Sequence, residues 1–175
     1  MIFLTVGTQF PFDRLVKAAD RAIEAGKLDE EICAQVGDSS YRPRCFEAVS
    51  HMEKHLFDEC VHKASAIIGH AGMGTITTAL DQDKPLLVMP RLRKYREAVN
   101  DHQLAIARKF EKLGHILVAY DAEELPAKIE ALKSFVPRKR KAQPGQVTER
   151  ISRFLDGLSG SENGPTKSRD LSSMD

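Results

Sequence analysis

The chain has 175 residues and a formal net charge of +1, with 42% hydrophobic and 29% charged residues. These values are ordinary for a globular protein and give no global argument for binding nucleic acid or acidic substrates. No apolar run approaches the roughly 18–20 residues that a membrane helix requires. The apolar N-terminal stretch lacks a basic leader and a small-residue cleavage site, so we expect a strand there and a cytoplasmic protein.

The first half of the chain alternates apolar runs with helical periods. We expect a strand at 2–6, a turn at 7–9, and an amphipathic helix that begins near Pro11 and is capped by Gly26. A second strand, 31–36, leads through an irregular stretch, which could hold a short strand at 46–49, to a helix at 54–63. A strand at 65–68 then runs into a loop at 69–75, which opens the next helix.

The second half continues the alternation with a strand at 85–89, a basic stretch at 91–96, a helix at 100–113, a strand at 116–119 and a helix beginning near Pro126. We expect one domain over 1–135, a basic linker and C-terminal helix over 136–158, and a disordered tail over 159–175. Apolar strands between helices predict the α/β class, with a single doubly wound, mostly parallel, Rossmann-like sheet. In such sheets ligands bind beyond the carboxyl ends of the strands.

The most informative of these strand-end loops reads GHAGMGT at 69–75, between a strand and a helix. Glycines let the backbone approach a ligand, and a helix N-terminus attracts an anion such as a diphosphate. The loop lacks the Gly-Lys-Ser/Thr of a Walker motif, and its glycine order is not that of the dinucleotide fingerprint. A tight turn without a ligand is the plain structural alternative.

His70 lies inside this loop, where the helix N-terminus should favour the neutral imidazole. It could hydrogen-bond a phosphate or a sugar hydroxyl, or simply shape the loop. Two other loops offer polar groups: the turn of Gly7, Thr8 and Gln9, and the NDHQ run at 100–103, whose first residues could serve only as a helix cap.

Three other features are weaker indications of a functional site. The cysteines at 33, 45 and 60 are odd in number and widely spaced, so we expect reduced thiols without a disulfide or zinc site. The Asp-x-Asp pattern at 81–83 lies at a helix end, away from the ligand loops, and is interpreted as surface. The basic run at 138–141 is interpreted as a solvated linker, although it could favour an anionic membrane.

Together, these segments resemble the C-terminal domain of glycosyltransferase family 28, over about residues 1–135. The resemblance is carried by TVGTQFPFDRL at 5–15, GHAGMGTI at 69–76, KPLLVMPR at 84–91 and NDHQ at 100–103. The sequence is similar in particular to the donor-binding subunits of two-subunit bacterial exopolysaccharide glycosyltransferases. It is also similar to the catalytic subunit of the eukaryotic dolichol-linked N-acetylglucosamine transferase.

The resemblance implies the UDP-sugar-binding half of a GT-B enzyme. Its expected nucleotide-sugar-binding residues are Gly7, Thr8, Gln9, Gly72, Met73, Gly74, Thr75, Arg91, His102 and Gln103, and His70 is the catalytic candidate. No metal or cofactor is expected besides the UDP-sugar co-substrate. In relatives an acid on the helix after the glycine loop holds the ribose, whereas this sequence has Thr78 there.

The implied reaction is inverting transfer of a sugar from a UDP-sugar to a lipid-linked acceptor at the cytoplasmic membrane face. The missing half would be a membrane-associated, acceptor-binding partner subunit. The donor sugar stays open, although the basic stretch at 91–96 could favour an acidic one. A non-catalytic enhancer of a partner transferase remains the alternative, while a two-domain epimerase is disfavoured by the chain length.

Overall fold

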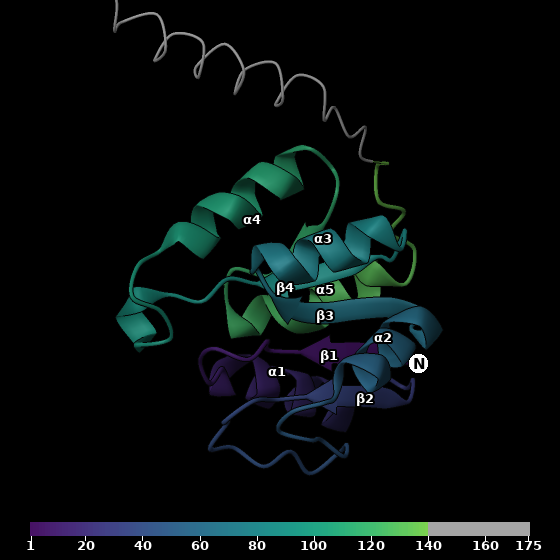
Figure 1. Cartoon of the computed structure of the whole chain (residues 1–175), viewed down its shortest axis with the longest axis vertical. Coiled ribbons are helices and arrows are strands. Elements are labelled where there is room, and N and C mark those ends of the chain that lie inside the picture. Colours follow the sequence, from purple (N-terminus) through teal and green to yellow (C-terminus); the bar gives the residue numbers. More distant parts are fainter. Residues whose placement is uncertain (140–175) are drawn as a thin grey trace, which may run out of the picture. The chain divides into compact units, whose positions relative to one another are not determined.

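The chain forms a five-stranded, all-parallel sheet in a computed structural model, which describes residues 1–139. The strands are β1 (Ile2–Thr5), β2 (Ile32–Gln35), β3 (Ala66–His70), β4 (Leu86–Met89) and β5 (Leu117–Val118) (Figure 1). Their order across the sheet is β2-β1-β3-β4-β5. The predicted α/β class and parallel sheet are therefore confirmed, and the stretch at 46–49 adds only an isolated bridge between Val49 and Gln35.

Residues 1–139 also form five α-helices: α1 (Asp13–Glu24), α2 (Lys54–Lys63), α3 (Met73–Asp81) and α4 (His102–Lys112) connect successive strands, and α5 (Leu125–Leu132) follows β5. Two short 3₁₀ turns, η1 (Arg93–Tyr95) and η2 (Ala122–Glu124), lie in the connections after β4 and β5. Pro126 occupies the first turn of α5, as predicted, whereas α1 begins two residues after Pro11.

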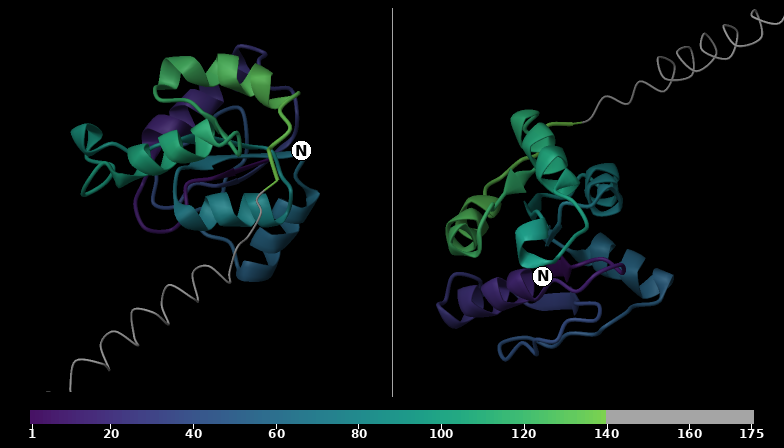
Figure 2. Two further views of the ribbon diagram at one scale, coloured as in Figure 1. Left: turned by 90° about the horizontal axis from the view of Figure 1, so that it is seen from above. Right: turned by 90° about the vertical axis from the view of Figure 1, so that its left-hand side faces the viewer.

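The core has two parts, one on each face of the sheet. On one face, α1 and α5 contribute side chains such as Leu15 and Ile129, and on the other α2, α3 and α4 contribute Val61, Ile76 and Ala107. Figure 2 (left) shows α1 and α5 on one side of the strands and α2 and α3 on the other. Strands buried on both faces need apolar residues at successive positions, which is why they read as continuous apolar runs.

The order of strand addition reverses between β1 and β3, because β2 lies on one side of β1 and β3, β4 and β5 lie on the other. Thr5 at the end of β1 pairs with Gly69 in β3, and His70 pairs with Met89 of β4. The loops that follow β1, β3 and β4 therefore leave the sheet side by side at its carboxyl edge. Ligands bind at this switch point in doubly wound sheets.

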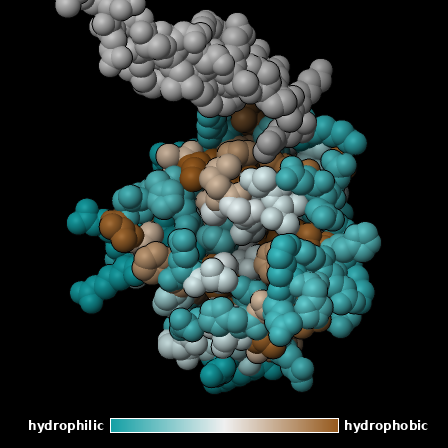
Figure 3. Space-filling view, viewed as in Figure 1, coloured by the Kyte–Doolittle hydropathy of each residue, from teal (hydrophilic) through white to brown (hydrophobic). Residues whose placement is uncertain are grey.

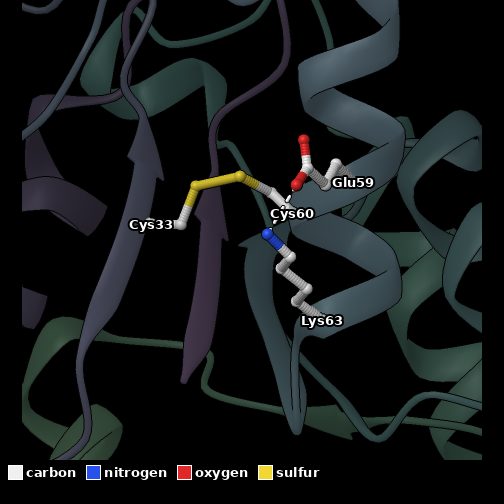
Figure 4. Close-up of a disulfide and its surroundings, with 4 residues drawn as sticks. All are labelled: Cys33, Glu59, Cys60 and Lys63. Atoms are coloured by element: carbon white, nitrogen blue, oxygen red, sulfur yellow. Dashed lines mark hydrogen bonds and ion pairs between the residues drawn. A yellow bond between two sulfur atoms is a disulfide. The ribbon is translucent and has the colours of Figure 1, made fainter.

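The prediction of reduced cysteines is wrong for two of the three. Cys33 on β2 and Cys60 on α2 form a disulfide with Cα atoms 6.5 Å apart (Figure 4). Cys45 is free and exposed. The two cysteines are 27 residues apart in sequence. They meet because the helix that follows β2 packs back over the same face of the sheet, and spacing alone does not show this.

The tail expected at 159–175 lies outside the described residues, as does all but the beginning of the linker and C-terminal helix expected over 136–158. Within residues 1–139, no helix has both the length and the apolar character needed to cross a bilayer.

Candidate functional site

A pocket of about 750 Å³ lies at the carboxyl edge of the sheet, over the switch point. The loops after β1, β3 and β4 contribute to its wall, together with the first turns of α3 and α4. All eleven residues selected from the sequence line this pocket: Gly7, Thr8, Gln9, His70, Gly72, Met73, Gly74, Thr75, Arg91, His102 and Gln103. The structure thus brings together residues that are up to 96 positions apart, which is the sequence distance from Gly7 to Gln103.

The N-terminus of α3 opens into this pocket. The helix begins at Met73, its N-cap is Gly72, and no side chain caps it. The first intrahelical bond involving the cap runs from the Ile76 N–H to the Gly72 carbonyl, at 3.1 Å. The N–H groups before Ile76 have no helical acceptor, so they and the helix dipole favour an anion in the pocket.

The glycines of the two loops are needed for close packing around the imidazole of His70. A Cβ on Gly7 would lie 2.7 Å from His70 Cε1, and one on Gly72 would lie 2.8 Å from His70 Cδ2. Gly7 also has a φ of 73°, which favours glycine. The ring is therefore held between the β1 loop and the start of α3.

His70 is the last residue of β3, and its Nδ1 lies 3.4 Å from the Thr75 hydroxyl. Burial, together with the nearby charge of Arg91, lowers the pKa of His70 to about 4. The imidazole is neutral at physiological pH, as expected for its position. With so low a pKa it is a weak base, so its geometry suits hydrogen bonding to a ligand better than accepting a proton.

Arg91 follows β4 and is 2% exposed. Its guanidinium donates hydrogen bonds to the carbonyls of Val6, at 2.6 Å, and Phe10. Its backbone N–H donates to Oε1 of Gln103, at 3.1 Å. The two side chains thus join the loops after β1 and β4 to the start of α4.

The N-terminus of α4 is not capped by the side chain of its N-cap residue. Asp101 is the N-cap residue, but its carboxylate accepts a hydrogen bond from the Arg93 N–H at 2.7 Å and does not cap the helix. Asn100 accepts from the backbone N–H of His102, at 3.2 Å, and also pairs with its ring. His102 is exposed and lines the pocket, so its side chain is available to a ligand.

Beside the pocket, the turn at 92–100 carries exposed basic and apolar side chains together. Arg93, Lys94 and Arg96 are exposed, Tyr95 is 45% exposed and Val99 is 77% exposed. This turn protrudes at the left of Figure 1, and hydrophobic and hydrophilic side chains alternate there on the surface (Figure 3). Arg91 is therefore the one member of the 91–96 basic run that is buried.

Sequence reasoning missed the wall that α2 contributes. Met52, Lys54, Phe57 and Asp58 line the pocket. Asp58 pairs with Lys54 at 2.6 Å and is the only carboxylate among the lining residues of the described chain. These residues belong to α2 or directly precede it, whereas the sequence argument predicts ligand contacts only from loops at the ends of strands.

The Asp-x-Asp pattern at 81–83 does not reach the pocket, and Asp83 pairs with Lys139 at 3.6 Å. Across residues 1–139, no group of three or more histidine, cysteine, aspartate or glutamate side chains is placed to hold a metal ion.

The sequence is similar to a known protein family and to several of its members. The pattern of the glycosyltransferase family 28 C-terminal domain matches residues 1–155. The chain is similar to UDP-N-acetylglucosamine transferase subunit ALG13 of Cryptococcus neoformans (34% identical over 106 residues, 59% of this chain and 50% of that protein) and of Homo sapiens (29% over 124 residues, 66% and 10%). It spans half or less of the length of these relatives.

Two solved structures share the fold. The solution structure of ALG13 aligns with a TM-score of 0.54 at 19% identity, over 88% of this chain and 94% of that one. The crystal structure of Acinetobacter baumannii MurG aligns with a TM-score of 0.55 at 20% identity, over 75% of this chain and 40% of that one. At this identity the likeness concerns the fold alone.

Proposed function

This chain belongs to the family of glycosyltransferase family 28 C-terminal domains, and on that premise we propose that it is the donor-binding subunit of a split, inverting glycosyltransferase. It binds a UDP-sugar and works with a membrane-associated partner subunit that binds a lipid-linked saccharide acceptor. The partner recruits it to the inner face of the membrane, and the pathway is exopolysaccharide synthesis.

One observation carries this proposal: two glycine loops and an uncapped helix N-terminus converge on one pocket. Gly74, where an added Cβ would meet no atom within 4 Å, leaves room for a ligand against the backbone, and the free N–H groups at the start of α3 suit a diphosphate. His102 and Gln103 line the same pocket from α4, where a sugar attached to the diphosphate can reach them. A pocket of about 750 Å³ is within the usual size range of ligand sites.

The chemistry that this pocket can assist is departure of UDP. In inverting transfer, the acceptor oxygen forms a bond to the anomeric carbon while the bond from that carbon to the β-phosphate oxygen breaks. UDP leaves with the electron pair, and the acceptor proton passes to a general base. Backbone N–H groups and the α3 dipole stabilise the charge that develops on the leaving diphosphate.

The general base is the part of the reaction that this chain supplies least well. His70 is the catalytic candidate, but the low pKa of its imidazole makes it a weak proton acceptor before an anion binds. A bound diphosphate would raise that pKa, because a nearby negative charge favours the imidazolium. We therefore place the base either at His70 in the loaded site or in the partner subunit.

The donor sugar is proposed from the relatives. Those named above are UDP-N-acetylglucosamine transferase subunits, which makes UDP-N-acetylglucosamine the first donor to test. Glucose, galactose and glucuronic acid are the competing sugars. The exposed basic side chains of the 92–100 turn lie beside the pocket and would favour an acidic sugar, so UDP-glucuronic acid belongs in the same experiment.

Gly74→Leu is the variant that tests the proposal most directly. A Cβ at Gly74 meets no atom within 4 Å, so a larger side chain should fill the pocket without disturbing the fold. Thr77→Val, a near-isosteric change on the same helix at a position that does not line the pocket, is the matched control. We expect UDP to bind the wild-type chain and the control in calorimetry, and to bind Gly74→Leu at least about 10-fold more weakly.

Transferase activity is then measured on the complex of this chain with its partner. Activity should fall with Gly74→Leu and persist with Thr77→Val. The donor-binding proposal fails if the wild-type chain has no affinity for UDP or UDP-sugars and the Gly74→Leu complex keeps full activity.

That same outcome would establish the alternative, a non-catalytic enhancer that binds and activates a partner glycosyltransferase. The observation in its favour is that Thr78 lines the pocket, at the position where the family resemblance implies an acid for the ribose. A threonine hydroxyl makes a weaker hydrogen bond than a carboxylate. Binding of the nucleotide therefore separates the two functions.

A further inference from the structure

Arg91 differs from the other basic residues near the pocket because its side chain is already bound to the protein. Its guanidinium donates hydrogen bonds to the carbonyls of Val6, at 2.6 Å, and Phe10. These carbonyls lie on either side of the Gly7-Thr8-Gln9 turn, in which Thr8 and Gln9 are exposed. One side chain therefore fixes both ends of a turn whose middle is free to contact a ligand.

The guanidinium is also held from the side. It lies over the ring of the fully buried Phe12, 5.0 Å from the ring centroid, and the guanidinium of Arg14 lies 5.3 Å from the same centroid. Arg14 in turn donates to the carbonyl of Pro90, at 2.8 Å, which precedes Arg91 in the chain. Hydrogen bonds thus connect the end of β4 to the start of α1 as well as to the loop after β1.

The charges in this cluster do not balance. Glu97 accepts two hydrogen bonds from Arg14, both at 2.9 Å, and forms its ion pair with that residue. In the part of the chain that the structure describes, Arg91 has no ion pair, and its Nε is buried without a hydrogen-bond partner. The charge of Glu97 acts on Arg91 without forming an ion pair with it, so the buried cation is only partly compensated and would stabilise an anion bound nearby.

The electrostatic influence of Arg91 extends into the pocket. Its charge is the second cause, after burial, of the lowered pKa of His70, whose ring lies between the two glycine loops. Arg91 keeps its own proton at neutral pH, because burial lowers the pKa of its guanidinium only to about 10. The same field that disfavours a proton on His70 favours a negative phosphate in the same space.

We propose that Arg91 is a positioning residue for the diphosphate, which holds both ends of the Gly7–Gln9 turn in its binding geometry and places a buried positive charge at the pocket wall. This inference rests on the proposed function, because the diphosphate belongs to the UDP-sugar. It assigns the specificity for phosphate to a group that acts through the loop backbone and through its charge.

The test compares ligands that differ in phosphate number. UDP, UMP and uridine are titrated into the full chain, its Arg91→Met and Arg91→Lys variants, and the control Arg108→Met, which removes an exposed charge on α4 that does not line the pocket. We expect Arg91→Met to weaken UDP by roughly 10- to 100-fold, the range for a charge-assisted interaction, UMP by less, and uridine by less than about 2-fold. Arg91→Lys keeps the charge and should recover part of the loss, while Arg108→Met should bind as the wild type does.

A second readout is independent of any ligand. The His70 ring is titrated by NMR in the wild type and in Arg91→Met, and its midpoint should rise from about 4 when the charge is removed. Equal losses for UDP and uridine, or an unchanged UDP affinity in Arg91→Met, would overturn the inference while leaving the donor-binding proposal intact. Failure of the wild type to bind UDP would instead count against the proposed function itself.

Discussion

Gly72→Ala should destabilise the protein, while Gly74→Ala, two residues later, should not. A Cβ at Gly72 would lie 2.8 Å from Cδ2 and 3.2 Å from Cε1 of His70, both closer than ordinary van der Waals contact. The ring has little room to move, because Gly7 packs against its other side. The backbone of Gly72, with φ −81° and ψ 142°, is open to alanine, so the cost comes from this overlap.

The expected size follows from these contacts. Forcing one extra carbon into a packed site costs about 1–3 kcal/mol of the free energy of unfolding. At Gly74 the added Cβ meets nothing within 4 Å, and alanine in the first turn of α3 is favoured over glycine by up to about 1 kcal/mol. The two variants should therefore differ by roughly 1.5–4 kcal/mol, with Gly74→Ala the more stable.

Urea denaturation, followed by circular dichroism, measures this difference without any ligand. The His70 ring resonances should also shift in Gly72→Ala and stay in place in Gly74→Ala. Equal unfolding midpoints for the two variants, together with an unmoved His70 ring, would refute the packing of the imidazole between the two glycine loops.

Three further predictions concern the disulfide, a buried carboxylate and the ribose. Removing the Cys33–Cys60 bond by Cys33→Ser should lower the free energy of unfolding by about 3.5 kcal/mol, because the disulfide restricts a loop of 27 residues in the unfolded chain. The control Cys45→Ser should leave the free energy of unfolding unchanged, and equal urea midpoints for the two variants would contradict this prediction. Burial opposes ionisation of Asp20, but hydrogen bonds from the Tyr41 hydroxyl and two backbone N–H groups outweigh burial and lower the pKa of this carboxyl. The stabilisation that the carboxylate contributes is therefore present above about pH 4 and is lost as pH falls through the lower folded pKa. Asp20→Asn should destabilise the protein by about 1–3 kcal/mol at pH 7 and flatten the acid limb of the stability curve. If the new carboxylate of Thr78→Glu accepts a hydrogen bond from the ribose 2′-hydroxyl, binding of UDP should strengthen several-fold while binding of 2′-deoxy-UDP stays unchanged. Equal gains for both nucleotides would show that the carboxylate does not act on the 2′-hydroxyl.

The fold class and eleven of the residues that line the pocket could be predicted from the sequence. Short apolar runs such as 65–68 and 85–89, which alternate with helical patterns, are typical of strands covered on both faces, and they predicted the parallel sheet. The carboxyl ends of parallel strands meet at one edge, so glycine and polar residues placed after those strands had to gather there. This is why residues as far apart as Gly7 and Gln103 could be assigned to one pocket before the structure was known.

The contacts between residues of different helices and strands are visible only in the three-dimensional structure. The sequence could not show that Cys33 and Cys60 meet, because their contact depends on how α2 packs over β2. Nor could it show that Asp58 reaches the pocket from a helix, or that Arg91 is the buried member of its basic run. Local periodicity specifies the direction of a side chain within its own element, whereas partners and burial depend on packing between elements that are distant in sequence.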